Sequence, residues 1–195
     1  MMRQAEVEIA RDHSLQGVLS SQSEIRGWNI QGLPSDQVSI ENAIFTMKCN
    51  KFPLLIDPQF QGLNWLRNRA RSSGRAGAAR DYEILKMPKN DYSAEFQVAS
   101  NNIYQKLQYS LLCGHQVIVE DMDATIDAGI DQLLDKAVYF EGTAKMIFFG
   151  ARSVEYHDDF RLYLTTKLSN PHYLPETFIK SQIVNFTVTY EGLDE

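Results

Sequence analysis

Short apolar runs alternate with longer segments of helical periodicity along this chain. A short apolar run bounded by turn residues is typical of a buried strand, whereas apolar residues at every third or fourth position indicate an amphipathic helix. These patterns predict helices at residues 35–47, 62–71, 99–112 and 127–138, and strands at 54–56, 82–87, 117–119, 145–151, 160–168 and 181–190. Strands separated by helices of about ten residues or more predict an α/β fold with a parallel sheet and crossover helices.

The composition is that of an ordinary globular protein with an acidic balance. The chain has 195 residues, of which 44% are hydrophobic and 23% charged, and its net charge is −6, so neither nucleic acid nor an acidic membrane is an expected partner. No apolar stretch approaches the ~18 residues that a membrane span needs, and the acids near the N-terminus are not typical of a secretion signal. Cys49 and Cys113 stand far apart in apolar contexts, which predicts buried free thiols in a reducing, cytosolic compartment.

One segment, residues 67–89, has the opposite charge. It carries seven basic residues against two acids, and its centre, RSSGRAGAAR, is rich in glycine, serine and alanine. This composition predicts a solvated, mobile insertion. The alternative is a basic contact surface for an acidic partner.

The stretch FPLLIDPQFQGLNW, residues 52–65, has the layout of a phosphate-binding loop. The motif GxxxxGK[ST] follows a buried strand and opens a helix, so that backbone N–H groups surround the phosphates. Laid over that spacing, this chain has aspartate in place of the first glycine, keeps the second glycine, and replaces the lysine and the hydroxyl residue by leucine and asparagine. The candidate positions are Asp57, Gln59, Gly62, Leu63 and Asn64.

Two further strand ends carry polar residues in the chain order that a P-loop nucleotide hydrolase requires. Glu120 and Asp121 follow the strand at 117–119, where a magnesium-binding Walker B pair would stand. Residues 165–170, which end in Asn170, follow a later strand, where a polar sensor for the γ-phosphate would stand. Ligands of such sheets gather beyond the carboxyl ends of the strands, so the three coincidences together favour the P-loop NTPase class.

The substitutions, however, predict the relic of a nucleotide site. Leu63 cannot supply the charge with which a lysine reaches the β- and γ-phosphates, and Asn64 replaces the hydroxyl that binds Mg²⁺. Asp57 would place a carboxylate where the phosphate belongs, a repulsion of about 1–4 kcal/mol at separations of ~4–6 Å. No metal site is predicted, because the four histidines lack ligand spacing and the aspartates at 121–131 lack the EF-hand glycine and glutamate.

Four longer phrases carry a resemblance to a known family. WNIQGLPSDQVSIENAI, PLLIDPQFQGLNWLRN, FRLYLTTKLSNPHYLPE and NFTVTYEGL resemble the dynein heavy chain, and within it the large subdomain of the fifth AAA+ module of the motor ring. The resemblance runs from about Leu15 to Glu195 and implies a three-layer α/β/α P-loop NTPase (AAA+) fold around a five-stranded, mainly parallel sheet. Residues 1–34 would be an N-terminal lead-in and adenine-side loop, and residues 35–195 the large α/β subdomain with a degenerate P-loop.

The resemblance implies a part of an ATP-driven motor that moves towards microtubule minus ends, in the cytoplasm, the cytoskeleton or a ciliary or flagellar axoneme. In that family the fifth module is regarded as structural and nucleotide-free, so no cofactor is expected in this segment, and ATP and Mg²⁺ belong to the parent motor. The implied partners are the neighbouring AAA+ modules and the stalk and strut coiled coil, with the microtubule reached only through a stalk tip that this sequence lacks. Asn170, within NPHY, matches the sensor asparagine of the active modules.

The segment by itself is therefore not expected to hydrolyse ATP, and since the family continues with a lid subdomain, an excised domain is the expectation. The alternative is an active ATP-binding module with an aberrant P-loop, in which Glu120 and Asp121 hold Mg²⁺. If no nucleotide holds the lead-in against the sheet edge, apolar packing must hold it there. The residues predicted to make that contact are Ile25, Trp28, Ile30 and Leu33.

Overall fold

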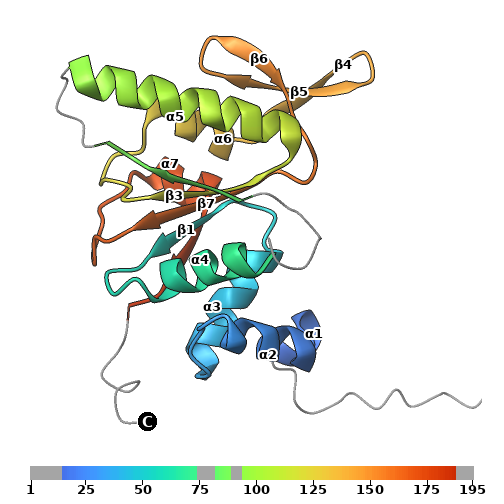
Figure 1. The fold of residues 1–195 in the computed structure, drawn as a ribbon, viewed down its shortest axis with the longest axis vertical. Coiled ribbons are helices and arrows are strands. Elements are labelled where there is room, and N and C mark those ends of the chain that lie inside the picture. Colours follow the sequence, from blue (N-terminus) through green and yellow to red (C-terminus); the bar gives the residue numbers. More distant parts are fainter. Residues whose placement is uncertain (1–14, 74–81, 89–93, 188–195) are drawn as a thin grey trace, which may run out of the picture.

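Five parallel strands form the central sheet of the computed structural model, which describes residues 15–73, 82–88 and 94–187 (Figure 1). Their order across the sheet is β2–β3–β7–β1–β8, and each neighbouring pair is parallel, so that all five carboxyl ends lie at one edge. The predicted α/β fold with a five-stranded parallel sheet is confirmed. The strands are β1 (Pro53–Ile56), β2 (Tyr82–Lys86), β3 (Gln116–Glu120), β7 (Arg161–Thr166) and β8 (Gln182–Asn185).

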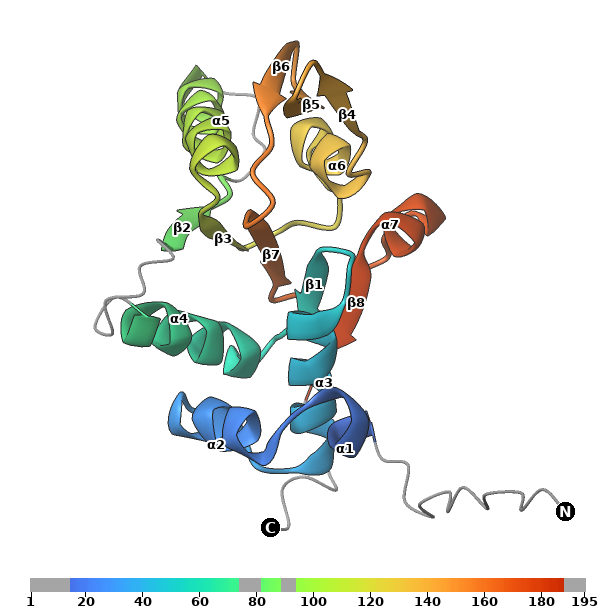
Figure 2. The same cartoon turned by 90° about the vertical axis from the view of Figure 1, so that its right-hand side faces the viewer.

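Helices cover both faces of this sheet, which makes three layers (Figure 2). Successive residues of a strand point to opposite faces, so Leu54 packs with residues of α5 and α6, whereas Leu55 packs with residues of α2, α3 and α4. No described helix is long and apolar enough to span a bilayer. The helices are α1 (Leu15–Leu19), α2 (Gln22–Ile30), α3 (Gln37–Lys48) and α4 (Gln61–Ser73) on one side, α5 (Ala94–Cys113) and α6 (Ala128–Leu134) on the other, and α7 (Pro175–Lys180) before β8.

A second, antiparallel sheet contacts α5 and α6, and it corrects two predictions (Figure 1). The strand predicted at 145–151 exists as β5 but belongs to this sheet, and the helix predicted to reach 138 ends at Leu134. Two-residue turns join its strands, and Gly142 and Gly150 have φ values of 63° and 65°, the left-handed geometry that such hairpins require. The strands are β4 (Val138–Glu141), β5 (Ala144–Phe149) and β6 (Arg152–Glu155).

The lead-in is held by one face of α2 and the turn that follows it. Ile25, Trp28 and Leu33 are buried in the cluster that covers one face of the central sheet, and the Trp28 ring meets the Trp65 ring edge-to-face at 6.1 Å between centroids. Ile30 is 87% exposed, so its predicted contact with the sheet is wrong. Two residues along a helix turn the side chain to the opposite side, away from Trp28. Residues 1–14 of the lead-in lie outside the described residues.

The two cysteines also differ from expectation. Cys49 is half-buried and Cys113 is exposed, and both are free thiols. Each closes a helix, since Cys49 caps α3 and Cys113 is the last residue of α5. Burial changes from one residue to the next at the end of α5, where Leu111 is buried and Leu112 is 48% exposed, so an apolar sequence context did not predict the exposure of the thiols.

Candidate nucleotide site

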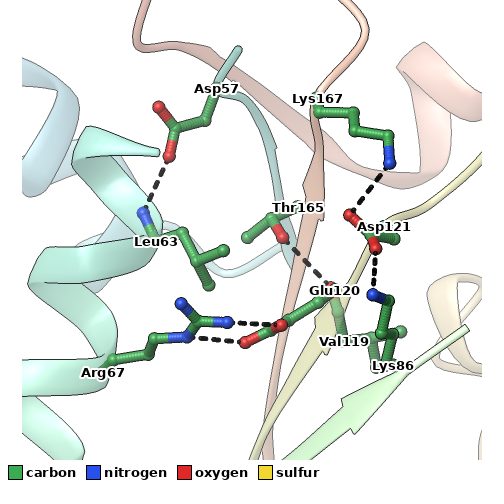
Figure 3. A network of polar contacts seen from close by, with 9 residues as sticks. All are labelled: Asp57, Leu63, Arg67, Lys86, Val119, Glu120, Asp121, Thr165 and Lys167. Carbon is green, nitrogen blue, oxygen red and sulfur yellow. Dashed lines mark hydrogen bonds and ion pairs between the residues drawn. The ribbon is translucent and has the colours of Figure 1, made fainter. Parts of the chain in front are cut away.

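The loop between β1 and α4 has the strand–loop–helix layout of a phosphate site, but a carboxylate of the chain itself faces the helix. Asp57 directly follows β1 and is 1% exposed. One carboxylate oxygen accepts the N–H of Gln61 at 2.9 Å. The other accepts the N–H of Leu63 at 2.8 Å, the bond that Figure 3 shows. These amides belong to the first turn of α4, where a P-loop would bind a phosphate. Asp57 therefore occupies the place of the anion at this helix N-terminus.

The protonation of Asp57 is set by two opposing effects. Burial raises the pKa of its carboxyl group above the ordinary value, and the backbone N–H groups of Leu63, Gln61 and Gly62 act in the opposite direction. In the described part of the chain no ion pair reaches this carboxylate. Its stabilising partners are the backbone donors and the positive end of the α4 dipole.

The remaining loop positions have structural reasons for their identities. Leu63 is buried in the cluster of α2, α3 and α4. A Cβ atom on Gly62 would lie 2.9 Å from Leu55 Cδ2 and 3.0 Å from a ring carbon of Phe186, so close packing requires glycine here without reference to a phosphate. The other two predicted positions are exposed: Gln59 and Asn64.

The first acid of the predicted Walker B pair is bound by an arginine. Glu120, the last residue of β3, is 7% exposed. Arg67 of α4 donates from Nε to Oε1 at 2.8 Å and from Nη2 to Oε2 at 2.6 Å (Figure 3). A bidentate pair of this kind is the strongest geometry between arginine and a carboxylate. It joins the helix after the loop to β3.

The second acid, Asp121, lies between two lysines. Lys86 Nζ is 3.1 Å from its Oδ2, and Lys167 Nζ is 3.6 Å from its Oδ1. Burial alone would raise the pKa of Asp121, but the hydrogen bond from Lys86 and the charge of Lys167 hold that pKa below its ordinary value. Its backbone is left-handed, with a φ of 58°. The carboxylate is thus ionised and already paired.

Three cations of this site were not among the predicted site residues: Arg67, Lys86 and Lys167. Two of them belong to the basic segment at 67–89, of which residues 74–81 and 89 lie outside the described residues. Arg67 lies in α4 and Lys86 in β2, as the predicted helix and strand have it, and both side chains form ion pairs with acids of the site. A signal was present in the sequence, since two acids at the end of a central strand require counter-charges.

The end of β7 contributes hydroxyl groups. Thr165 Oγ1 donates to the carbonyl of Val119 at 3.4 Å, and Thr166 Oγ1 donates to the carbonyl of Met122 at 2.8 Å. Asn170, the predicted sensor, stands four residues beyond β7 and is exposed. Across the described residues no hydrogen bond connects it with the three acids of the site. The structure therefore brings Asp57, Glu120 and Asp121 to the same sheet edge, while Asn170 forms no described hydrogen bond with them.

A parallel sheet whose first strand leads through a loop into a helix, with acids at the end of β3 on the other side of β7, defines the α/β P-loop class of the AAA+ type. Comparison with known sequences narrows this class. Residues 26–195 match the family model described as the ATP-binding dynein motor region. The chain belongs to this dynein family.

The relatives are axonemal and flagellar dynein heavy chains. Human dynein axonemal heavy chain 6 is 36% identical over 190 residues, and mouse dynein axonemal heavy chain 2 is 35% identical over 193 residues. The dynein alpha chain of the flagellar outer arm of Chlamydomonas reinhardtii is 32% identical over 178 residues. These matches cover 97%, 99% and 91% of this chain but 4% of each relative, so the chain corresponds to a small part of their length.

The family description implies ATP, and the residues of this loop do not fit it. The first-turn amides of α4 are engaged by Asp57, the position of the phosphate-binding lysine is the buried Leu63, and Glu120 is engaged by Arg67. Within the described ranges, no group of three or more histidine, cysteine, aspartate or glutamate side chains is placed to hold a metal ion. The groups of this chain that would bind a nucleotide are thus already hydrogen-bonded or ion-paired with one another.

Proposed function

We propose that this segment is a structural AAA+ module that works without nucleotide inside a dynein heavy chain. The observation that carries the proposal is the buried carboxylate of Asp57, which accepts the N–H groups of Gln61 and Leu63. A phosphate would have to displace this carboxylate from the helix N-terminus. The displaced group would then lose its hydrogen bonds and stand beside a second anion, which opposes binding.

The ion pairs at the end of β3 support the same proposal. Arg67 joins α4 to Glu120, and two lysines join Asp121 to β2 and to the segment after β7. In an active P-loop protein, magnesium and phosphates connect the corresponding elements. Here cationic side chains connect them permanently, so the fold keeps its geometry through an ATP cycle that takes place elsewhere.

We assign the segment to the large subdomain of the fifth AAA+ module of the motor ring. The assignment rests on the quoted phrases, two of which run from β1 into α4 and from β7 to the start of α7. The partners would be the neighbouring AAA+ modules and the stalk and strut coiled coil, with ATP and Mg²⁺ bound elsewhere in the heavy chain. Because the relatives are named axonemal and flagellar dyneins, we place the parent motor in the axoneme, where it would move along microtubules.

Calorimetric titration of the 195-residue chain with Mg-ATP tests the nucleotide-free state. We expect no binding tighter than about 10 μM, an affinity that corresponds to ~7 kcal/mol. Tighter binding would contradict the proposal and favour the active module in which Glu120 and Asp121 hold Mg²⁺.

A pair of variants separates charge from shape. The triple variant Asp57→Gly, Leu63→Lys, Asn64→Thr removes the resident anion and adds a phosphate-binding cation, so it should acquire measurable affinity for Mg-ATP. The double variant Leu63→Lys, Asn64→Thr keeps Asp57 and should not. Circular dichroism verifies that both variants are folded. If the folded triple variant still fails to bind, the loop is blocked by its packing, and the role given to the Asp57 carboxylate is wrong.

A further inference from the structure

The two edge strands of the central sheet, β2 and β8, differ in how their outward backbone groups are satisfied (Figure 2). Gln182 and Phe186 of the β8 segment donate their N–H groups to β1, so the carbonyl groups of Ile183 and Asn185 point outward. Asn42 Nδ2 donates to the carbonyl of Asn185 at 2.7 Å, and Gln182 Nε2 donates to that of Ile183 at 3.4 Å. At this edge, side chains of the protein itself bind the outward carbonyl groups.

At β2 the outward backbone groups have no such partner among the described residues. Met87 donates its N–H group to the carbonyl of Glu120 in β3, and alternate residues of a strand turn their backbone groups to opposite sides. The backbone groups of Ile84 and Lys86 therefore point away from the sheet, and the Ile84 side chain is 45% exposed. Two N–H donors and two carbonyl acceptors of β2 are thus available to a further strand.

A groove lies beside this edge, between β2 and α5. Its volume is about 640 Å³, which is within the range of ligand sites in proteins. Leu85 and Ile103, both buried, belong to its apolar wall, and the exposed amide side chains of Asn102 and Gln105 belong to its polar wall. The groove can therefore receive apolar side chains from a strand that pairs with β2.

The charged side chains of the groove are already paired within the chain. Lys106 Nζ lies 2.9 Å from Glu83 Oε1, and Lys86 Nζ lies 3.1 Å from Asp121 Oδ2. These are all the charged residues that line the groove in the described part of the chain, apart from Asp121, which lies at the carboxyl edge. The groove therefore matches an uncharged segment better than an acidic or a basic one.

We propose that β2 is a docking edge for an extended, uncharged segment from elsewhere in the parent heavy chain, which adds a sixth strand to the central sheet. A row of backbone donors and acceptors selects an extended main chain, because the backbone groups of a helix are paired with one another. A segment rich in β-branched residues fits this position, with alternate side chains in the groove.

The parent chain is the source to which the proposal commits, and this choice rests on the proposed place of the protein inside a heavy chain. The matches cover 4% of each relative, so most of such a chain lies outside the sequence described here. A segment of the same polypeptide also reaches the edge at a high effective concentration, which favours the weak pairing of a single short strand.

An array of 12-residue peptides that covers the whole parent heavy chain, probed with the 195-residue protein, tests this inference. We expect binding to be confined to uncharged segments rich in β-branched residues, with a dissociation constant between about 1 μM and 1 mM in solution. Ile84→Pro removes an outward N–H group and leaves the hydrogen bonds to β3 in place, a position at which edge strands tolerate proline. It should weaken binding by about tenfold or more, whereas Ile84→Val keeps the N–H group and should bind as the unmodified protein does.

Two further measurements leave the protein unmodified, so they decide the matter even where Ile84→Pro fails to fold. N-methylation of every second residue of the bound peptide should abolish binding when the methyl groups face β2, and change it by less than about threefold on the alternate residues. In hydrogen exchange, the amides of Ile84 and Lys86 should exchange faster than that of Leu85 in the free protein, and saturating peptide should slow them by about tenfold or more.

The inference is overturned if no peptide of the array binds, if Ile84→Pro binds as strongly as Ile84→Val, or if the two methylation patterns have equal effects. Dimerisation of the protein that Ile84→Pro abolishes would also overturn it, because a second copy would then occupy the edge. Ile84 lies outside the loop at 57–64 and the acid pair, so a negative result leaves the nucleotide-free state to its own titration with Mg-ATP.

Discussion

Removing the Arg67 guanidinium should cost this fold about 2–3 kcal/mol of unfolding free energy. The side chain of Glu120 is 9% exposed and that of Arg67 is 36% exposed, so the carboxylate is the more deeply buried partner. Removal of one partner from a fully buried pair costs about 3–5 kcal/mol, and an exposed pair is worth about 0–1 kcal/mol. Because solvent reaches the arginine, we expect a cost between these two ranges. For a chain of this size it corresponds to a fall of roughly 4–12 °C in the melting temperature.

Urea unfolding at neutral pH, followed by circular dichroism, measures the effect in a double-mutant cycle. Arg67→Met keeps the alkyl stem and leaves Glu120 as an unpaired buried charge. Glu120→Gln removes that charge, so the double variant should be more stable than Arg67→Met, with a coupling energy of about 2 kcal/mol. Arg26→Met, at an exposed position of α2, is the control and should change stability by less than ~0.5 kcal/mol.

Two results would refute this reasoning. A cost of less than ~0.5 kcal/mol for Arg67→Met would place the pair with ordinary surface ion pairs. A double variant no more stable than Arg67→Met would mean that Glu120 does not depend on the arginine for its charge compensation. Either result would also mean that the Arg67–Glu120 ion pair is not what holds α4 against β3.

Three further predictions concern the lead-in, the acid pair and a helix end. Trp28→Ala should lower the unfolding free energy by about 3–5 kcal/mol, whereas Ile30→Ala on the exposed face of the same helix should change it by less than ~0.5 kcal/mol; equal effects in urea unfolding would mean that α2 is not docked. Asp121→Asn tolerates the left-handed backbone but loses the negative charge between two lysines, so it should be less stable than the unmodified chain. Because the pKa of Asp121 is lowered in the folded state, this difference in stability should be full above pH 3.8 and disappear as the pH falls through the folded pKa. Unfolding curves across that range measure the difference, and an advantage independent of pH would contradict the pairing. Gly114→Ala should destabilise more than Gly142→Ala in thermal unfolding, because both have positive φ but only the Cβ at 114 would meet a histidine ring at 2.5 Å; equal losses would mean that the ring moves aside without cost.

The local pattern of hydrophobic residues was sufficient to predict most strands of the central sheet. The continuous run Val117–Val119 predicted a strand buried on both faces, and β3 is buried at every position. The same criterion also predicted a strand around Ile147, but it does not distinguish a parallel from an antiparallel neighbour. Gly142 and Gly150 mark the hairpin turns of the second sheet, and those turns decide the partners of β5.

For the candidate site, the identities of the loop residues predicted which nucleotide-binding groups are missing. The three-dimensional structure decided which side chains occupy their places. The aspartate and leucine in the loop were sufficient to predict the loss of a phosphate-binding lysine and the presence of an anion. That Asp57 turns its carboxylate onto the amides of Gln61 and Leu63 depends on the bend between β1 and α4. Asn170 shows the opposite case, since a motif match placed it at the site and the segment after β7 leaves it exposed.

The sequence by itself determined the class of fold, the degenerate character of the loop and the resemblance to dynein, because these depend on periodicity and on residue identity within short windows. The tertiary structure decided which charges meet. Arg67 and Glu120 are 53 positions apart in the chain, and Asp121 meets Lys167 because β3 pairs with β7. A side chain finds such partners only when the crossovers of the parallel sheet bring distant segments to one edge, and that information is not present in any local pattern.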